Sequence, residues 1–410
     1  MCSDDKKLKI RETIKANKVR RKGFSVKVFS CKVDVSHCSV KKLKLLNGLF
    51  LQAKWLYNEI LGSVDLFKFD TKIKTVNVHF KDKIEVRDLT IGSQIKQSIF
   101  ERTKQNIINL GKAKKVGIKT GRLKFKSEVN SIPLKQYGVT YRLVGNSYVK
   151  IQGIGKLKCA GLNQLKGEIT SAVLVKTSQG YFLKATCYTE KETEMRAGVI
   201  GIDFGIKDTV VDSNGVKQNF RFPVPEKLKC KQRDLSRKVK GSNNYRKQCN
   251  RISRNYEQLT NQKNDAANKY VASLKKYEKV IIQDENIRGW HANLFGKQVQ
   301  QSILGRIKSK IQNLETSVTI NRWLPTTKMS PVSFKKINIG LNDRIFKDGN
   351  FEEDRDTKSA KTILCFGLYK PSLTHKELMG LPAEERVSIF SNYKFEVSKL
   401  FPMKQEAFAL

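Results

Sequence analysis

Short apolar runs and helical stretches alternate along residues 198–366, and this alternation limits the possible folds more than any other feature of the chain. The runs VIGIDFGI (199–206), KVIIQDENI (279–287) and SVTINRW (317–323) have the length of buried strands. Between them lie a very basic helical stretch at 226–278 and an amphipathic helix predicted at 296–314. Such alternation predicts an α/β layer built around a largely buried sheet.

Acidic residues stand beside apolar runs at three points along the chain. They are Asp203, the cluster QDEN at 283–286 and the cluster EDRD at 353–356. A carboxylate beside buried apolar residues is costly unless it is paired or binds a metal. Taken alone, Asp203 could be satisfied by a neighbouring lysine or a backbone amide. Three converging acids could instead hold two Mg²⁺ or Mn²⁺ ions about 4 Å apart.

The charge of the chain indicates what those acids would act on. The sequence has 80 Lys and Arg against 38 Asp and Glu, a formal net charge of +42. Self-repulsion of this size is normally compensated by a polyanion, so DNA or RNA is the expected partner. No run reaches the roughly 20 apolar residues of a membrane span. The eight cysteines contain no CxxC pair, which favours reduced thiols in an intracellular protein.

The first 195 residues have a different pattern. Apolar and polar residues alternate at 24–36, as in a half-buried strand, and residues 40–111 have helical periodicity. Further β-rich runs are expected from RLKFKSEV (122–129) to residue 190, with a hairpin turn at Ser178–Gly180. The pattern predicts one β-barrel interrupted by a helical insert.

Several segments resemble one known family. GIDFGIKDTVV (201–211), LSRKVKGSNNYRKQ (235–248), RWLPTTKMSPVS (322–333) and EDRDTKSAKTIL (353–364) are similar to the RuvC-type nuclease domain of TnpB proteins and miniature type V CRISPR effectors. The ending MKQEAFAL also resembles TnpB tails. The match covers residues 198–366, and before them the likeness rests on architecture alone.

The resemblance implies a multidomain α+β fold. Its expected parts are a β-barrel (WED) at 1–39 and 122–195, a helical (REC) insert at 40–121, an RNase H-like α/β RuvC domain at 196–324 and 353–370, a zinc-ribbon-like insert at 325–352 that binds target nucleic acid, and a C-terminal tail at 371–410.

The same resemblance implies an RNA-guided DNA endonuclease that uses Mg²⁺ (or Mn²⁺). Asp203, Glu285 and Asp356 would be the catalytic metal ligands, and Arg344 and Arg355 would neutralise phosphate charge. A salt bridge to Asp354 or Asp356 is the alternative role for Arg355. The implied partners are a guide RNA and double-stranded target DNA with a short flanking motif. The implied location is the prokaryotic cytoplasm, with nucleoid association when the protein is bound to DNA.

Two departures from the family pattern affect this interpretation. The second motif usually ends its strand in Glu, whereas this chain has Gln283 followed by Asp284 and Glu285. If the strand continued, Glu285 would point to the same face as Gln283, so Glu285 is the expected ligand and Asp284 the alternative.

The second departure concerns the ribbon, which usually carries four zinc cysteines in the form CPxC…CxCG. Ser330 and Ser333 replace the first pair, and Lys347 and Gly349 stand near the second. Serine does not bind Zn²⁺ as thiolates do, so no zinc is predicted. Packing of apolar residues is expected to hold the ribbon together, namely Ile337, Ile339, Leu341, Ile345 and Phe346.

Basic residues between 226 and 278 are the expected nucleic-acid contacts. They are Arg237, Lys238, Lys240, Arg246, Lys247, Arg251 and Arg254. Two further functions remain open from the sequence. The chain could be a guided DNA-binding protein without nuclease activity, acting as a repressor or target marker, because Gln283 and the missing thiolates weaken the nuclease motifs. A DNA transposase or resolvase of related fold is the other.

Overall fold

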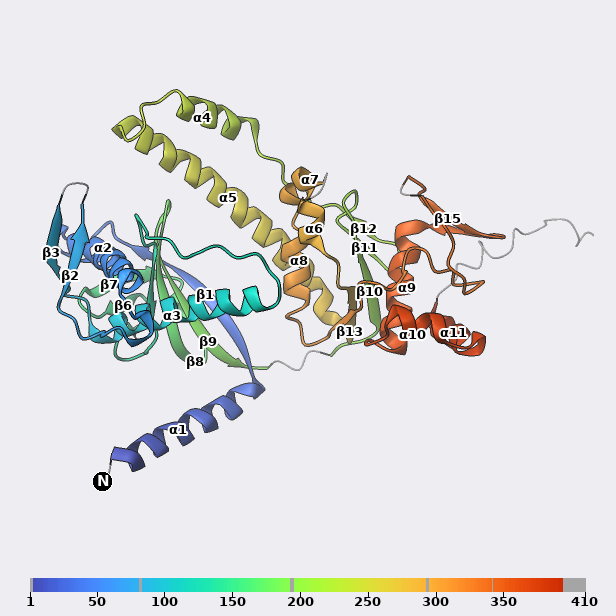
Figure 1. Cartoon of the computed structure of the whole chain (residues 1–410), viewed down its shortest axis with the longest axis horizontal. Helices are drawn as coiled ribbons and strands as arrows, with labels where there is room; N and C mark the ends of the chain where they lie inside the picture. The colour runs from blue at the N-terminus through green and yellow to red at the C-terminus, as the bar shows by residue number, and fades with distance from the viewer. Residues whose placement is uncertain (1–2, 81–82, 192–194, 293–294, 341, 394–410) are drawn as a thin grey trace, which may run out of the picture. The chain divides into compact units, whose positions relative to one another are not determined.

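The computed structural model describes residues 3–80, 83–191, 195–292, 295–340 and 342–393. The chain divides into two compact units, Met1–Glu192 and Thr193–Leu410. Each has both helices and strands, so the predicted multidomain α+β class is confirmed (Figure 1). Within the described ranges, no helix is long and apolar enough to cross a membrane.

The N-terminal unit is a seven-stranded antiparallel sheet that nearly closes into a barrel. Its strand order is β4-β8-β9-β1-β7-β6-β5. In chain order the unit contains α1 (Ser3–Arg20), β1 (Phe24–Asp34), α2 (Val40–Gly62), β2 (Thr75–His79), β3 (Ile84–Asp88), α3 (Ser93–Lys115), β4 (Ser131–Leu134), β5 (Tyr141–Val144), β6 (Tyr148–Ile151), β7 (Gly155–Ala160), β8 (Glu168–Thr177) and β9 (Gly180–Glu190). Helices α2 and α3 share one hydrophobic core with the sheet, in which Leu46, Ile99 and Leu183 are fully buried.

Most of the predictions for this unit are confirmed. The strand β1 and the turn between β8 and β9 at Ser178–Gly180 form as expected. The helical insert also contains the hairpin β2–β3, which its helical periodicity did not indicate. The predicted strand at 122–129 is wrong. There the backbone of Lys126 exchanges two hydrogen bonds with the side chain of Asn58 in α2, at 2.9 and 3.0 Å, and so pairs with a helix in place of a strand.

The C-terminal unit is built on a five-stranded mixed sheet in the order β12-β11-β10-β13-β14. Its elements are β10 (Val199–Phe204), β11 (Val210–Asp212), β12 (Lys217–Gln218), α4 (Glu226–Ser236), α5 (Asn243–Ser273), β13 (Lys279–Gln283), α6 (Ile287–Ala292), α7 (Gly296–Gln301), α8 (Leu304–Ile311), β14 (Ser317–Ile320), β15 (Ile345–Asp348), β16 (Phe351–Asp354), α9 (Arg355–Tyr369), α10 (His375–Gly380) and α11 (Ala383–Ile389).

The three central strands are parallel, with β13 between β10 and β14. Alternate residues of β13 face two separate hydrophobic cores: Val280 and Ile282 pack with α5 and α8, whereas Ile281 packs with α9 and the C-terminal helices. Figure 1 shows α9 and α8 on opposite sides of these strands. The predicted α/β layer with a buried sheet is therefore confirmed. Its parallel strands end at one edge, which brings residues 203 and 283 close together.

Two predicted elements of this unit differ from the structure. The helix expected at 296–314 is interrupted at Ser302, because the chain leaves α7 to form an isolated β-bridge between Ser302 and Arg221. In the expected tail from residue 371, α10 and α11 pack into the core through Leu378 and Ile389. The MKQEAFAL segment lies outside the described residues.

Candidate active site

Strand β10 carries Asp203 on the face that packs against α9. Gly201 lies on the same face, and a Cβ at this glycine would be 2.3 Å from the carbonyl oxygen of Ala360 in α9. Only glycine permits so close an approach. The first turns of α9 therefore press against the strand next to Asp203, and Ser359 of α9 hydrogen-bonds to its carboxylate.

The surroundings of Asp203 raise its pKa to about 8. Burial is the largest cause, and the carboxylates of Asp356 and Glu285 raise the pKa further, whereas hydrogen bonds from Ser359 and Phe204 lower it. The carboxylates of Glu285 and Asp356, singled out in the sequence, thus both lie close enough to Asp203 to affect its pKa. The three acids come from β10, from the residues after β13 and from the first turn of α9.

Gln283 has a structural role at the end of β13. Its side chain is buried, and its Nε2 donates to the carbonyl oxygens of Asn321, Arg322 and Leu324 at 2.9 to 3.2 Å. Its Oε1 accepts a bond of 2.9 Å from the Thr326 hydroxyl. Both polar atoms of the Gln283 side chain therefore bind and fix the loop 321–326, which follows β14.

The two acids after Gln283 have different surroundings. Asp284 pairs with Lys308 at 2.7 Å and with Arg322, and these cations hold its pKa below the ordinary value. Burial raises the pKa of the half-buried Glu285, whose carboxylate forms no hydrogen bond or ion pair with the described residues. β13 ends at Gln283, so the strand does not continue to Glu285 and strand alternation does not determine where this side chain points. Even so, Glu285 is the acid that acts on Asp203.

At the start of α9, two neighbouring acids pair with different cations. Asp354 caps the helix, accepting from the backbone N–H of Thr357 at 3.0 Å, and pairs with Lys217 at 2.6 Å. Asp356 pairs with Arg355 at 3.1 Å and with Arg344 at 3.7 Å. The salt bridge considered for Arg355 therefore exists, and both predicted arginines lie against the third acid.

Lys358 is a fully buried residue of this region that the sequence analysis missed. Its ammonium group donates to the carbonyl oxygens of Thr326 and Thr327 at 3.0 and 2.9 Å and lies 4.1 Å from the centre of the Phe346 ring. Burial lowers its pKa to about 7, and the carboxylates of Glu353 and Asp203 oppose that change. The helical spacing could have indicated a buried position, since Lys358 lies seven residues before Cys365 on the same face of α9.

The donor chemistry of the cluster fits a hard divalent cation. Carboxylate oxygens are the ligands that Mg²⁺ and Mn²⁺ prefer, and a cation would offset the repulsion that raises the pKa of Asp203. In the conformation observed, the described residues contain no group of three or more His, Cys, Asp and Glu side chains that could hold one metal ion. Joint ligation would therefore need Asp356 to turn away from its arginines.

In the ribbon, hydrogen bonds surround Ser330, which stands at the first of the cysteine positions expected from the sequence motifs. Ser330 is fully buried, and its hydroxyl donates to Asp348 at 2.5 Å and accepts from the backbone N–H groups of Val332 and Ser333 at 3.0 and 3.1 Å. Lys347 is exposed and pairs with Glu352, and Gly349 has a φ of +59° in the turn between β15 and β16.

The packing expected to hold the ribbon is confirmed in part. Phe346 is fully buried, and Ile337 and Ile339 pack against the same core. Ile345 is 51% exposed, because successive side chains of β15 point to opposite faces. Leu341 lies outside the described residues.

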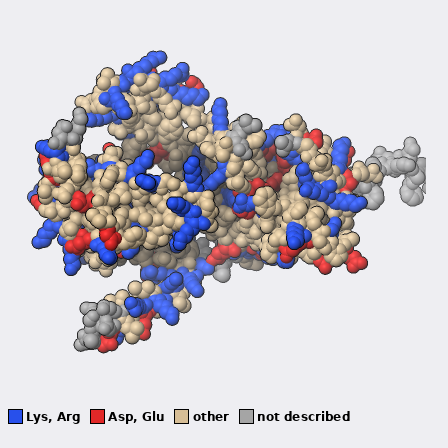
Figure 2. Space-filling view, viewed as in Figure 1, with Lys and Arg blue, Asp and Glu red and all other residues tan. Residues whose placement is uncertain are grey.

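The predicted nucleic-acid contacts all lie on the hairpin of α4 and α5. All seven of the basic residues named for this role are exposed. Figure 2 shows Lys and Arg side chains spread over the visible face of the chain, with fewer Asp and Glu side chains between them. The hairpin is thus one part of a widely basic surface.

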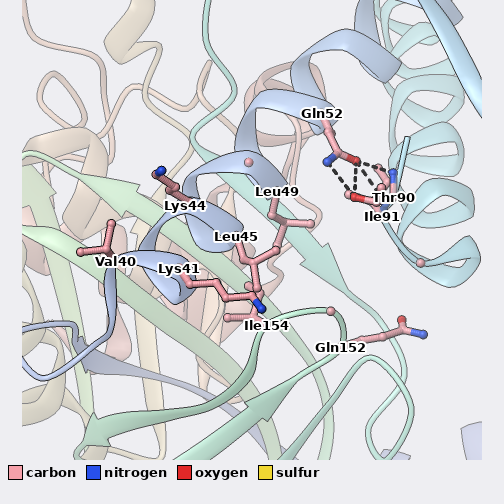
Figure 3. A pocket seen from close by; sticks show the side chains of 13 residues that line it. Val40, Lys41, Lys44, Leu45, Leu49, Gln52, Thr90, Ile91, Gln152 and Ile154 are labelled. Carbon is pink, nitrogen blue, oxygen red and sulfur yellow. Dashed lines mark hydrogen bonds between the residues drawn. The ribbon is translucent and has the colours of Figure 1, made fainter. Parts of the chain in front are cut away.

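A pocket of about 410 Å³ in the N-terminal unit had no signal in the sequence. It lies between the start of α2, the loop 90–92 and the turn 152–154 (Figure 3). Gln52 fixes one wall by accepting from the backbone N–H groups of Thr90 and Ile91 at 2.7 and 3.1 Å. Leu45 and Leu49 give the pocket an apolar side, and Lys41 and Lys44 supply positive charge.

Comparisons with known proteins agree on one family. Residues 182–291, which include Asp203 and Glu285, match the OrfB_IS605 family model, described as a probable transposase. A putative RNA-guided DNA endonuclease of Streptomyces pristinaespiralis is 28% identical over 183 residues, which are 41% of this chain and 45% of that protein. The putative RNA-guided DNA endonuclease InsQ of Escherichia coli K12 is 24% identical over 184 residues, 43% of this chain and 45% of that protein. Each match thus spans less than half the length of the relative.

Proposed function

The chain belongs to the TnpB family, and from this premise we propose that it is an RNA-guided endonuclease that cleaves DNA at the cluster of Asp203, Glu285 and Asp356. The observation that carries the proposal is that Glu285 and Asp356 converge on the buried Asp203: burial is the main cause that raises the pKa of Asp203 to about 8, and these two carboxylates raise it further. Strongly shifted carboxylates of this kind are typical of functional sites.

Each acid has a distinct part in the proposed site. Asp203 and Glu285 are the residues whose carboxylates would hold Mg²⁺, because the carboxylate of Asp284 is neutralised by Lys308 and Arg322. Two divalent cations would be held there, one to supply an activated water and the other to stabilise the leaving 3′-oxygen. Asp356 would join these two acids when DNA phosphate takes over the charge of Arg344 and Arg355, its partners in the free protein.

Guide RNA and target DNA are the proposed partners. The net charge of +42 and the exposed basic residues of α4 and α5 support this assignment, and both relatives carry names that specify RNA guidance of a DNA endonuclease. Base pairing with the guide would supply most of the specificity, together with a short flanking DNA motif read by the protein.

The test is cleavage of a target plasmid by the protein co-expressed with its native RNA, with Mg²⁺ or with EDTA. We expect Mg²⁺-dependent cutting that Asp203→Ala abolishes. Glu285→Gln should lower the rate by about 100-fold or more, since it removes one ligand charge. Asp284→Asn is the matched control and should retain most of the activity.

Two outcomes would contradict the proposal in different ways. An intact plasmid despite guided target binding would show a guided DNA-binding protein without nuclease activity. Cutting by Asp203→Ala would show that the reaction occurs elsewhere in the chain.

A further inference from the structure

Trp323 is exposed in a way that folding alone does not explain. Its side chain is 73% exposed, and among the described residues no aromatic side chain is more exposed. Tryptophan contributes to stability mainly by burying its large ring, so an exposed tryptophan leaves that contribution unused. Trp323 lies in the loop after β14, at the edge of the sheet where the proposed active site lies.

The backbone that presents Trp323 is held on both sides. Its own N–H donates to Asn321 Oδ1 at 2.9 Å. Gln283 binds the carbonyl oxygens of the residues before and after it, Arg322 and Leu324, and Leu324 is buried. The loop backbone that carries the exposed ring is therefore held in place by hydrogen bonds. Binding of a ligand to the ring would cost little backbone entropy.

The loop also borders the carboxylate cluster. Arg322, next to Trp323, pairs with Asp284. Thr326 accepts a hydrogen bond of 3.4 Å from Ser359, the residue that also bonds to Asp203. A strand that reaches Asp203 therefore passes close to the loop 321–326.

From these contacts we infer that Trp323 is a stacking platform for a nucleobase of the single-stranded DNA that enters the active site. That the bound strand is DNA follows from the proposed function, and the inference rests on that function in this respect. A tryptophan face binds any base, so the platform would position the strand without selecting its sequence. Gln283, which stands where the family usually has an acid, would serve the substrate indirectly by holding the platform in place.

Tryptophan fluorescence tests this inference without cleavage. The protein is titrated with an oligothymidylate in EDTA, at salt high enough to weaken non-specific binding. The wild-type emission should be quenched, because a stacked base quenches the indole. Trp323→Phe should bind with similar affinity but lose most of the quenching. Trp55→Phe, which removes a half-buried tryptophan of the N-terminal unit, is the matched control and should keep the quenching.

Truncation supplies the second measurement. Trp323→Ala should weaken oligonucleotide binding by about tenfold, and circular dichroism should show an unchanged fold because the side chain is exposed. Quenching that persists in Trp323→Phe, unchanged affinity in Trp323→Ala, or quenching by RNA oligonucleotides alone would overturn the inference. A protein that shows the expected quenching but never cuts plasmid would instead contradict the proposed function, and the role of Trp323 in binding would still hold.

Discussion

Ser330 and Asp348, the last residue of β15, are joined by a hydrogen bond of 2.5 Å within the ribbon. Burial alone would raise the pKa of Asp348, but hydrogen bonds from Ser330 and Ser333 outweigh it and hold the pKa below its ordinary value. The ionised carboxylate thus takes part in the bond. Its contribution to stability is present above the ordinary aspartate pKa and is lost as the pH falls through the lowered one.

Replacing Ser330 tests whether this bond maintains the ribbon. Ser330→Ala removes the donor to Asp348 and leaves two backbone N–H groups, those of Val332 and Ser333, without their acceptor. We expect the free energy of unfolding to fall by about 2 kcal/mol in urea denaturation. The exposed Lys336→Ala in the same ribbon is the control and should change little. Equal effects of the two substitutions would show that packing around Phe346 suffices.

Restoring an acid at position 283 should harm the protein. In Gln283→Glu, a carboxylate would face the carbonyl oxygens of Asn321, Arg322 and Leu324, which now accept hydrogen bonds from Nε2. We expect a loss of about 2 kcal/mol in the free energy of unfolding, and no gain in plasmid cleavage. The loss should shrink at acidic pH, where the new side chain is protonated. The exposed Gln300→Glu is the control, and a more active Gln283→Glu enzyme would refute the structural role of Gln283.

The raised pKa of Asp203 predicts a specific pH dependence of stability. Between the ordinary pKa of 3.8 and about 8, the folded chain holds a proton that the unfolded chain releases. Stability therefore falls as the pH rises through this window. In EDTA, Asp203→Asn should raise the free energy of unfolding by at least about 1 kcal/mol near pH 8, and the gain should vanish toward about pH 4. Thermal melts across this range measure it, with the exposed Asp234→Asn as control. A pH-independent gain would contradict the assignment.

The sequence predicts those parts of the site that local patterns determine. Asp203 follows from an apolar strand with an acid near its end, and Asp354 and Asp356 from acids at a helix start. The sheet also follows, because its strands are short apolar runs. These features depend on neighbours within a few residues, which the sequence displays directly.

The surroundings of the two candidate middle acids could not be predicted from the sequence, because they come from distant segments. Asp284 is neutralised by Lys308 and Arg322, which lie 24 and 38 residues further along the chain. The same holds for Gln283, whose partners belong to the loop after β14. No local pattern indicates which carboxylate a distant lysine will pair with, so the sequence favoured Glu285 over Asp284 only through strand alternation and gave no sign of the cations around Asp284.

Two ion pairs near the ribbon test how burial changes the cost of removing one partner of an ion pair. Lys361 and Glu353 are 2.5 Å apart with side chains only 8% and 3% exposed, whereas Lys347 and Glu352 are 2.6 Å apart but 62% and 51% exposed. Lys361→Met should cost about 3–5 kcal/mol, because it leaves the buried carboxylate of Glu353 with its hydrogen bond from Tyr393 but without its cation, and Glu353→Gln in the same chain should restore part of the loss. Lys347→Met should cost less than about 1 kcal/mol. Urea denaturation compares them, and similar costs would contradict the role of burial.

The basic hairpin should contribute more to RNA binding than charge of equal size elsewhere. Replacing Arg246, Lys247 and Arg251 with alanine removes three exposed cations from α5. If all three contact phosphates, the slope of log Kd for the guide RNA against log salt should fall by about 2. The matched control removes the same charge from α1 through the triple alanine variant of Arg11, Lys15 and Lys18, all exposed. An equal fall in both variants would show that the charge of the chain acts diffusely and that the hairpin is not a distinct binding surface.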